Sequence, residues 1–196
     1  MYIFTCHQPI VKRFFFCCTI FLFTGFPFYS SAQLWNGNLG VPVLNMTFGT
    51  GHSQPLPTNV SSYTYTGGCP SPGKYSIEHF LFGCETGTWI MLTGDHTKNH
   101  DGNYMLVNGA TEPATVYMDT ITGLCGNTTY QFSAWISNCM QNTACGGKPV
   151  LTNLTLSIET IAGAVLVSYN TGDIATTDSK VWKEYGVYCT TPVTPI

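Results

Sequence analysis

Short runs in which apolar and polar residues alternate recur along the second half of the chain. The run 129–138, "TYQFSAWISN", places Tyr130, Phe132, Ala134 and Ile136 on one side and Gln131, Ser133, Trp135 and Ser137 on the other. A period of two is typical of a strand with one buried face. Runs at 153–160, 164–170 and 185–191 are similar, and Gly, Pro, Asn and Thr clusters separate them. The pattern predicts one all-β domain, a sandwich or a barrel.

The first 32 residues have the pattern of a signal peptide. Lys12 and Arg13 precede an uncharged apolar run, Phe14 to Phe28, and small residues lead up to Ala32. Fifteen apolar residues would span only about 22 Å as a helix, which is less than the ~30 Å of a bilayer core. A retained membrane anchor is the alternative. We therefore predict a signal peptide over 1–32 and an exported single domain over 33–196, with no membrane insertion after cleavage.

Charge and cysteine content indicate which partners and cross-links to expect in the mature chain, which is the part that remains after signal cleavage. Residues 33–196 carry five lysines, no arginine and ten carboxylates. Without clustered cations, nucleic acid is not an expected partner. Six cysteines remain, which in an exported protein are expected to form disulfides. They are Cys69, Cys84, Cys125, Cys139, Cys145 and Cys189. We predict a Cys69–Cys84 pair and a bond from Cys139 to either Cys145 or Cys189.

The segment 94–109, "GDHTKNHDGNYMLVNG", crowds two histidines and two aspartates in front of a strand-like apolar run. Zinc binding by His96 and His100 is disfavoured, because the sequence is a poor helix former and lacks the metalloprotease glutamate. A structural calcium ion, held by Asp95, Asp101 and backbone carbonyls, suits an oxygen-rich loop better. The alternative is a turn that these side chains fix by hydrogen-bonding nearby backbone amides.

Trp135 shares its strand face with Gln131, Ser133 and Ser137. A flat ring beside hydrogen-bonding groups is the combination that recognises a sugar, so these four residues are the predicted ligand face. The alternative is that a second sheet or a loop covers the face. No pair of carboxylates and no G-x-S-x-G motif marks a catalytic centre, so we predict that the chain is not an enzyme. A polysaccharide hydrolase with unidentified carboxylates and a ligand-free spacer of an adhesin are the alternative functions.

Six motifs occur in a fixed order between Val43 and Pro192. They are "VLNMTFGTG" (43–51), "CPSPGKYSI" (69–77), "DHTKNHDGNYMLVNG" (95–109), "ITGLCGNTTYQFSAWISN" (121–138), "TGDI" (171–174) and "WKEYGVYCTTP" (182–192). Together they resemble the amino-terminal module of large secreted surface proteins of gliding bacteria, which carry a type IX secretion sorting domain. That module is similar to the galactose-binding-like jelly rolls of carbohydrate-binding modules.

The resemblance implies a jelly-roll β-sandwich and a secreted carbohydrate-binding or adhesion module on the cell surface. Its expected partner is a glycan or another cell-surface polymer. In the family, further strands follow the motif at 182–192, with a Gly-Asn-Asp turn and an Asp-Asp-Ile strand. Because this chain stops at Ile196, we expect a domain without its last strands. A partner for Cys125 and an aspartate of the calcium site would belong to that missing part.

Overall fold

The computed structural model describes residues 42–85 and 87–192. The predicted signal peptide, residues 1–32, lies outside the described residues, as does the end of the chain at Ile196. The described part is almost entirely β, with a single one-turn helix. Its elements are β1 (Thr64–Tyr65), β2 (Lys74–Glu78), β3 (Phe80–Leu81), β4 (Leu92–Thr93), β5 (Tyr104–Asn108), β6 (Thr129–Ile136), α1 (Ala144–Gly147), β7 (Thr152–Glu159), β8 (Val165–Ile174) and β9 (Lys183–Thr190). The prediction of an all-β, sandwich-like fold is confirmed.

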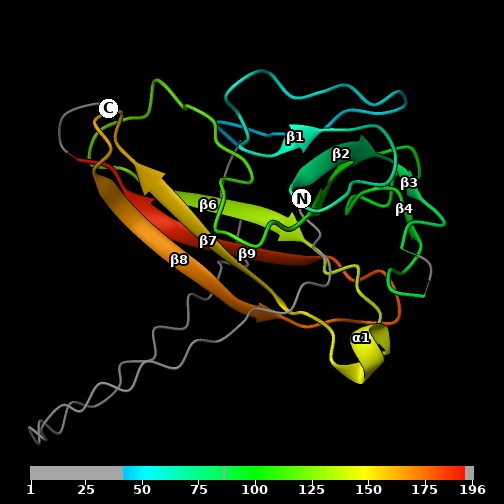
Figure 1. Ribbon diagram of the computed structural model, residues 1–196. Helices are drawn as coiled ribbons and strands as arrows, with labels where there is room; N and C mark the ends of the chain where they lie inside the picture. The colour runs from blue at the N-terminus through cyan, green and yellow to red at the C-terminus, as the bar shows by residue number, and fades with distance from the viewer. Residues whose placement is uncertain (1–41, 86, 193–196) are drawn as a thin grey trace, which may run out of the picture.

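The strands form one group of three and three separate pairs (Figure 1). β1 runs parallel to β2, and β2 pairs antiparallel with β5. β3 with β4, β6 with β9 and β7 with β8 are antiparallel pairs. β8 also lies against β9, so the four longest strands form one layer, and the β1–β2–β5 sheet lies to one side of them.

The alternating runs of the sequence correspond closely to the long strands. The run 129–138 becomes β6, the run 153–160 becomes β7, and the runs 164–170 and 185–191 lie within or overlap β8 and β9. The apolar side of β6 faces inward, where Phe132, Ala134 and Ile136 pack against the core. These strands form because β-branched and aromatic residues at every second position fit a pleated, half-buried surface.

β5 separates two hydrophobic clusters and is buried on both faces. The inter-sheet core lies on the side of Met105 and Val107, and its other members are Tyr63, Tyr75, Ile77, Ile136, Leu156, Ile174 and Tyr185. The disulfide core lies on the side of Tyr104 and Leu106. Its other members are Leu81, Cys84, Trp89, Ile90, Leu92, Cys139, Met140 and Ala144. A strand with two covered faces has an unbroken apolar sequence, which explains the run "YMLV" after the polar loop.

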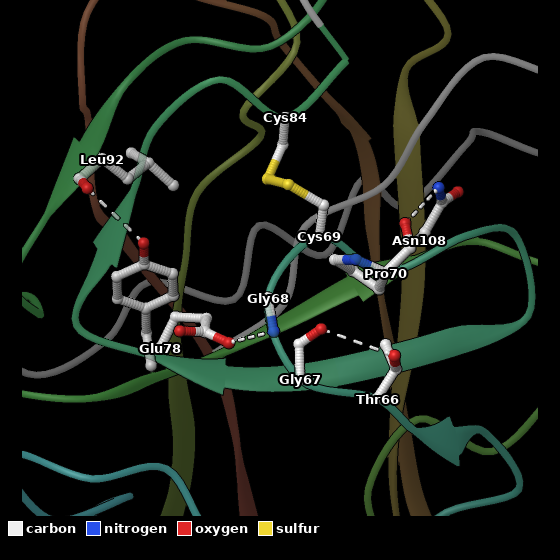
Figure 2. The surroundings of a disulfide bond; sticks show 10 residues. Thr66, Gly67, Gly68, Cys69, Pro70, Glu78, Cys84, Leu92 and Asn108 are labelled. Carbon is white, nitrogen blue, oxygen red and sulfur yellow. Dashed lines mark hydrogen bonds between the residues drawn. A yellow bond between two sulfur atoms is a disulfide. The ribbon is translucent and has the colours of Figure 1, made fainter.

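The predicted disulfide between Cys69 and Cys84 is confirmed (Figure 2). It links the segment before β2 to the segment after β3. Two hydrogen bonds hold the same region. The Gly68 N–H donates to Glu78 Oε1 at 2.8 Å, and Asn108 Nδ2 donates to the Pro70 carbonyl at 2.9 Å.

The prediction that Cys139 bonds to Cys145 or Cys189 is wrong. Cys139 and Cys189 are free thiols, and Cys145 is disulfide-bonded, but not to Cys139. Cys189 pairs in register with Tyr130 near the start of β6, whereas Cys139 follows the end of that strand. The nine residue steps from position 130 to position 139 would span about 30 Å in extended conformation. Cys139 instead packs in the disulfide core, where burial raises the pKa of its thiol.

Candidate functional site

The outward face of the β6–β9 pair carries most of the predicted ligand residues. In the register of the two strands, Gln131 lies opposite Tyr188, and Trp135 lies opposite Glu184. Residues directly opposite each other in an antiparallel pair have neighbouring side chains on the same face. The predicted face on β6 therefore continues onto β9 through the pairs formed by Gln131 and Trp135.

Hydrogen bonds between the two strands fix the polar side chains of this face. The Tyr188 hydroxyl donates to Gln131 Oε1 at 2.9 Å. The Ser133 hydroxyl donates to Glu184 Oε1 at 2.7 Å. Each bond holds two polar groups in one position, and the Gln131 amide keeps its N–H donors while the Ser133 hydroxyl and the Glu184 carboxylate keep acceptor positions. The face is thus a row of ordered hydrogen-bonding groups.

Trp135 stands at one end of this row, and its side chain is 37% exposed. The imidazole of His96 stacks on its indole, with ring centroids 4.9 Å apart and an interplanar angle of 15°. A loop therefore covers part of Trp135, as the alternative expected, but it leaves part of the side chain exposed. We call the set of residues His96, Gln131, Ser133, Trp135, Glu184 and Tyr188 the Trp135 strip.

The loop that carries His96 is fixed by its own side chains. Asp95 Oδ1 accepts hydrogen bonds from the backbone N–H and the hydroxyl of Thr97, at 2.8 and 2.6 Å. The Asp95 carboxylate lies directly over Gly102, where a Cβ would come within 2.5 Å of it. At the start of the loop, Gly94 has a φ of +64°, and the Asn99 carbonyl is so close that a Cβ on Gly94 would overlap it. These contacts direct His96 towards β6.

Of the two aspartates proposed for calcium, Asp95 uses its side chain within the loop, whereas Asp101 is held through its backbone carbonyl. The Asp95 carboxylate binds Thr97, which is the turn-fixing alternative, and the Asp101 carbonyl accepts the Gly51 N–H at 3.4 Å. Within the ranges that the structure describes, no group of three or more His, Cys, Asp or Glu side chains could hold a metal ion. The calcium site predicted from Asp95, Asp101 and backbone carbonyls has fewer acidic ligands than such a group, and it stays a prediction.

Ser137 does not belong to the ligand face, which corrects the prediction for this residue. β6 ends at Ile136, and from there the chain turns into the interior. Ser137 is only 1% exposed, and the following residues Asn138, Cys139 and Met140 are also buried. The alternation of the sequence continues for one residue beyond the strand, so the pattern alone assigned Ser137 to the wrong environment.

Gly186 lets the two strands approach closely in the middle of the strip. It lies opposite Ser133, and a Cβ at this position would come within 2.4 Å of the Phe132 carbonyl and 2.7 Å of the Ser133 Cβ. Its lack of a side chain leaves the polar groups on either side uncovered. A glycine in a strand interior often marks such a close approach.

Three strip residues were missed by the sequence reasoning. Glu184 and Tyr188 alternate with Tyr185 and Val187 along "KEYGVYC", so the pattern could have placed them on one face, but not opposite β6. No local pattern brings His96 to Trp135, because the two residues are 39 positions apart. Two other tryptophans of the described ranges are packing residues: Trp89 is part of the disulfide core, and Trp182 packs against it.

The strip combines one exposed aromatic ring with paired hydroxyl, amide, carboxylate and imidazole groups. Only one of its residues, Glu184, is a carboxylic acid, so the strip has no carboxylate pair for glycoside hydrolysis. No helix within the described ranges is long and apolar enough to span a membrane. Comparison with protein-family models, curated proteins and solved structures gives no match.

Proposed function

We propose that the chain is a secreted, non-catalytic carbohydrate-binding or adhesion module of a bacterial cell-surface protein, with the Trp135 strip as its ligand face. The observation that carries the proposal is the exposed indole of Trp135 at the end of a row of hydrogen-bonded polar side chains. This pairing of a flat apolar surface with ordered polar groups is the chemistry that a sugar chain requires.

The dimensions of the strip favour a short oligosaccharide over a single ring. Gln131 and Trp135 are four residues apart on an extended strand, which corresponds to about 13 Å. The apolar face of one sugar residue would stack on the part of the indole that His96 leaves open. Hydroxyls of the following residues would exchange hydrogen bonds with Ser133, Glu184 and Gln131.

We further infer that the strands follow a jelly-roll, galactose-binding-like arrangement. The support is the antiparallel pairing of the long strands around the inter-sheet core, together with the resemblance of the six sequence motifs to surface modules of gliding bacteria. In such a module, binding partners are glycans or other polymers of a cell surface. The absence of a carboxylate pair on the strip favours binding without turnover.

The proposal is tested by glycan-array binding of the mature protein and its Trp135→Ala variant. Removal of the indole is expected to weaken binding about tenfold or more, which corresponds to ~1.4 kcal/mol. Phe82→Ala is the matched control, because Phe82 is an aromatic residue with 72% exposure outside the strip. Equal binding by all three proteins would refute the assignment of the strip.

The same preparation distinguishes the other two functions. Release of reducing ends from a polysaccharide, lost on replacement of a single Asp or Glu, would establish a hydrolase. Absence of both binding and turnover across the array would instead support a structural spacer.

A further inference from the structure

An open pocket of about 250 Å³ lies away from the Trp135 strip. It is lined by Gly51, His52, Ser53, Glu78 and His79. Two distant parts of the chain form it: the segment that precedes β1, and the end of β2 with the residue after it. Its volume is below the 300–1,000 Å³ of most sites for drug-sized ligands, so it suits one small ring.

Backbone hydrogen bonds hold both walls of this pocket against the loop 94–102. On one side, Thr50 pairs with Gly102, and the Gly51 N–H donates to the Asp101 carbonyl. On the other side, the His79 carbonyl accepts the Gly94 N–H at 2.6 Å. The pocket is therefore built on the same ordered loop that positions His96, although it shares no residue with the strip.

The lining groups can donate and accept hydrogen bonds. Glu78 Oε1 accepts the Gly68 N–H, and the Ser53 hydroxyl oxygen accepts a hydrogen bond from the Tyr65 hydroxyl at 3.4 Å. The Ser53 proton and the imidazoles of His52 and His79 add further donor and acceptor positions. This mixture matches a ligand whose own groups are both donors and acceptors, as hydroxyls are.

The charged groups of the pocket disfavour a small anion, and its possible metal ligands do not form a metal site in the described part of the chain. No lysine or arginine lines it, so an anion would meet a carboxyl group and no permanent cation. Burial raises the pKa of Glu78, against the opposing effect of its Gly68 hydrogen bond, and both the acid and the carboxylate can accept a hydrogen bond from a hydroxyl group. Two imidazoles and a carboxylate are typical zinc ligands, but they do not come together as a metal-binding group within the described residues.

We infer that this pocket is a second binding site, which takes one neutral hydroxylated ring, a single sugar residue or a cyclic polyol, through hydrogen bonds to its imidazole, carboxyl and hydroxyl groups. The inference goes beyond the proposed function because it requires neither Trp135 nor the rest of the strip. A chain with both sites would bind an extended glycan on one surface and a single ring at another.

The inference is tested by NMR titration of the mature protein with neutral monosaccharides and inositol, following the imidazole signals of His52 and His79. We expect saturable shifts of both imidazoles for at least one of these probes, with a Kd on the order of 1 mM. The exposed residue His52 offers a variant that should fold normally, and His52→Ala is expected to weaken binding about tenfold or more. His100→Ala, which removes an exposed imidazole outside the pocket, is the matched control and should bind normally.

Two variants of Glu78 test the ligand class, and Trp135→Ala distinguishes the pocket from the strip. Glu78→Gln should retain binding, because the amide keeps a donor and an acceptor, whereas Glu78→Leu should lose it. Loss of binding in Glu78→Gln would overturn the neutral class, and absence of shifts at both imidazoles with every probe would overturn the site. Trp135→Ala should leave these shifts unchanged, so failure of the strip and failure of the pocket are distinguishable.

Discussion

Replacement of Cys69 by alanine opens the confirmed disulfide and leaves the second sulfur in place. The two cysteines are separated by 15 residues, and cross-linking a loop of this length stabilises a protein by about 3 kcal/mol through restriction of the unfolded chain. Cys84 is the buried partner, and its packing in the disulfide core is retained. The variant therefore isolates the effect of the cross-link from that of core packing.

We expect the free energy of unfolding of Cys69→Ala to fall by about 3 kcal/mol. At roughly 2–4 °C per kcal/mol for a chain of this size, Tm should fall by roughly 6–12 °C. Urea unfolding followed by tryptophan fluorescence, with linear extrapolation, measures the change. Cys125→Ala is the control, because it removes an exposed free thiol and should change the stability by less than ~0.5 kcal/mol.

A second variant checks the interpretation of the first. Cys69→Ala/Cys84→Ala should lose more stability than the single replacement, because alanine at 84 leaves space in the disulfide core. A loss below about 1 kcal/mol in Cys69→Ala would refute the reasoning. It would mean that residual structure already restricts this segment in the unfolded chain without the cross-link.

Three other substitutions test the loop, the strip and the pocket. Gly94→Ala should destabilise the protein by more than the ~1–2 kcal/mol of left-handed backbone strain, because a Cβ would overlap the Asn99 carbonyl. Gly49→Ala, with φ +74° and open space around it, should cost only that strain, and equal losses in urea unfolding would contradict the clash. Gly186→Ala should lower stability by about 1–3 kcal/mol in thermal unfolding, because a Cβ would press on the backbone of β6; an unchanged Tm would show that the strands can separate freely. The pKa of Glu78 is raised in the folded protein, so its protonated form contributes to stability. This contribution is complete at pH values below 4.5, the ordinary pKa, and it is lost as the pH rises through the folded-state pKa. Glu78→Gln should therefore be more stable than the parent protein at neutral pH, with a difference in urea midpoint that disappears towards acid; a difference that grows towards acid would contradict this sign.

The sequence predicted β5 to β9 but not the short early strands, because alternation and apolar runs are local patterns that need several residues. The alternation in 129–138 indicates which side chains of β6 face the core. The apolar run after Asn103 indicates a strand that is covered on both faces. The local signal fails where the strand ends: Ser137 continues the alternation in the sequence, yet the chain has already turned inward.

Features that join distant parts of the chain could not be predicted in the same way. The stacking of His96 on Trp135 depends on how a loop before β5 meets β6, and no spacing in the sequence encodes it. The pairing of Cys139 failed for the same reason, since the antiparallel register of β6 and β9 separates it from Cys189. Pairing between strands is set by the burial of whole faces and not by neighbouring residues.

The burial of β5 on both faces makes this strand the link between the two hydrophobic cores. Neither core can open without exposing one face of the strand to water. Disruption of one cluster therefore also destabilises the other. The described domain should consequently behave as one cooperative unit, and the amide protons of β5 should exchange with solvent only when the whole domain unfolds.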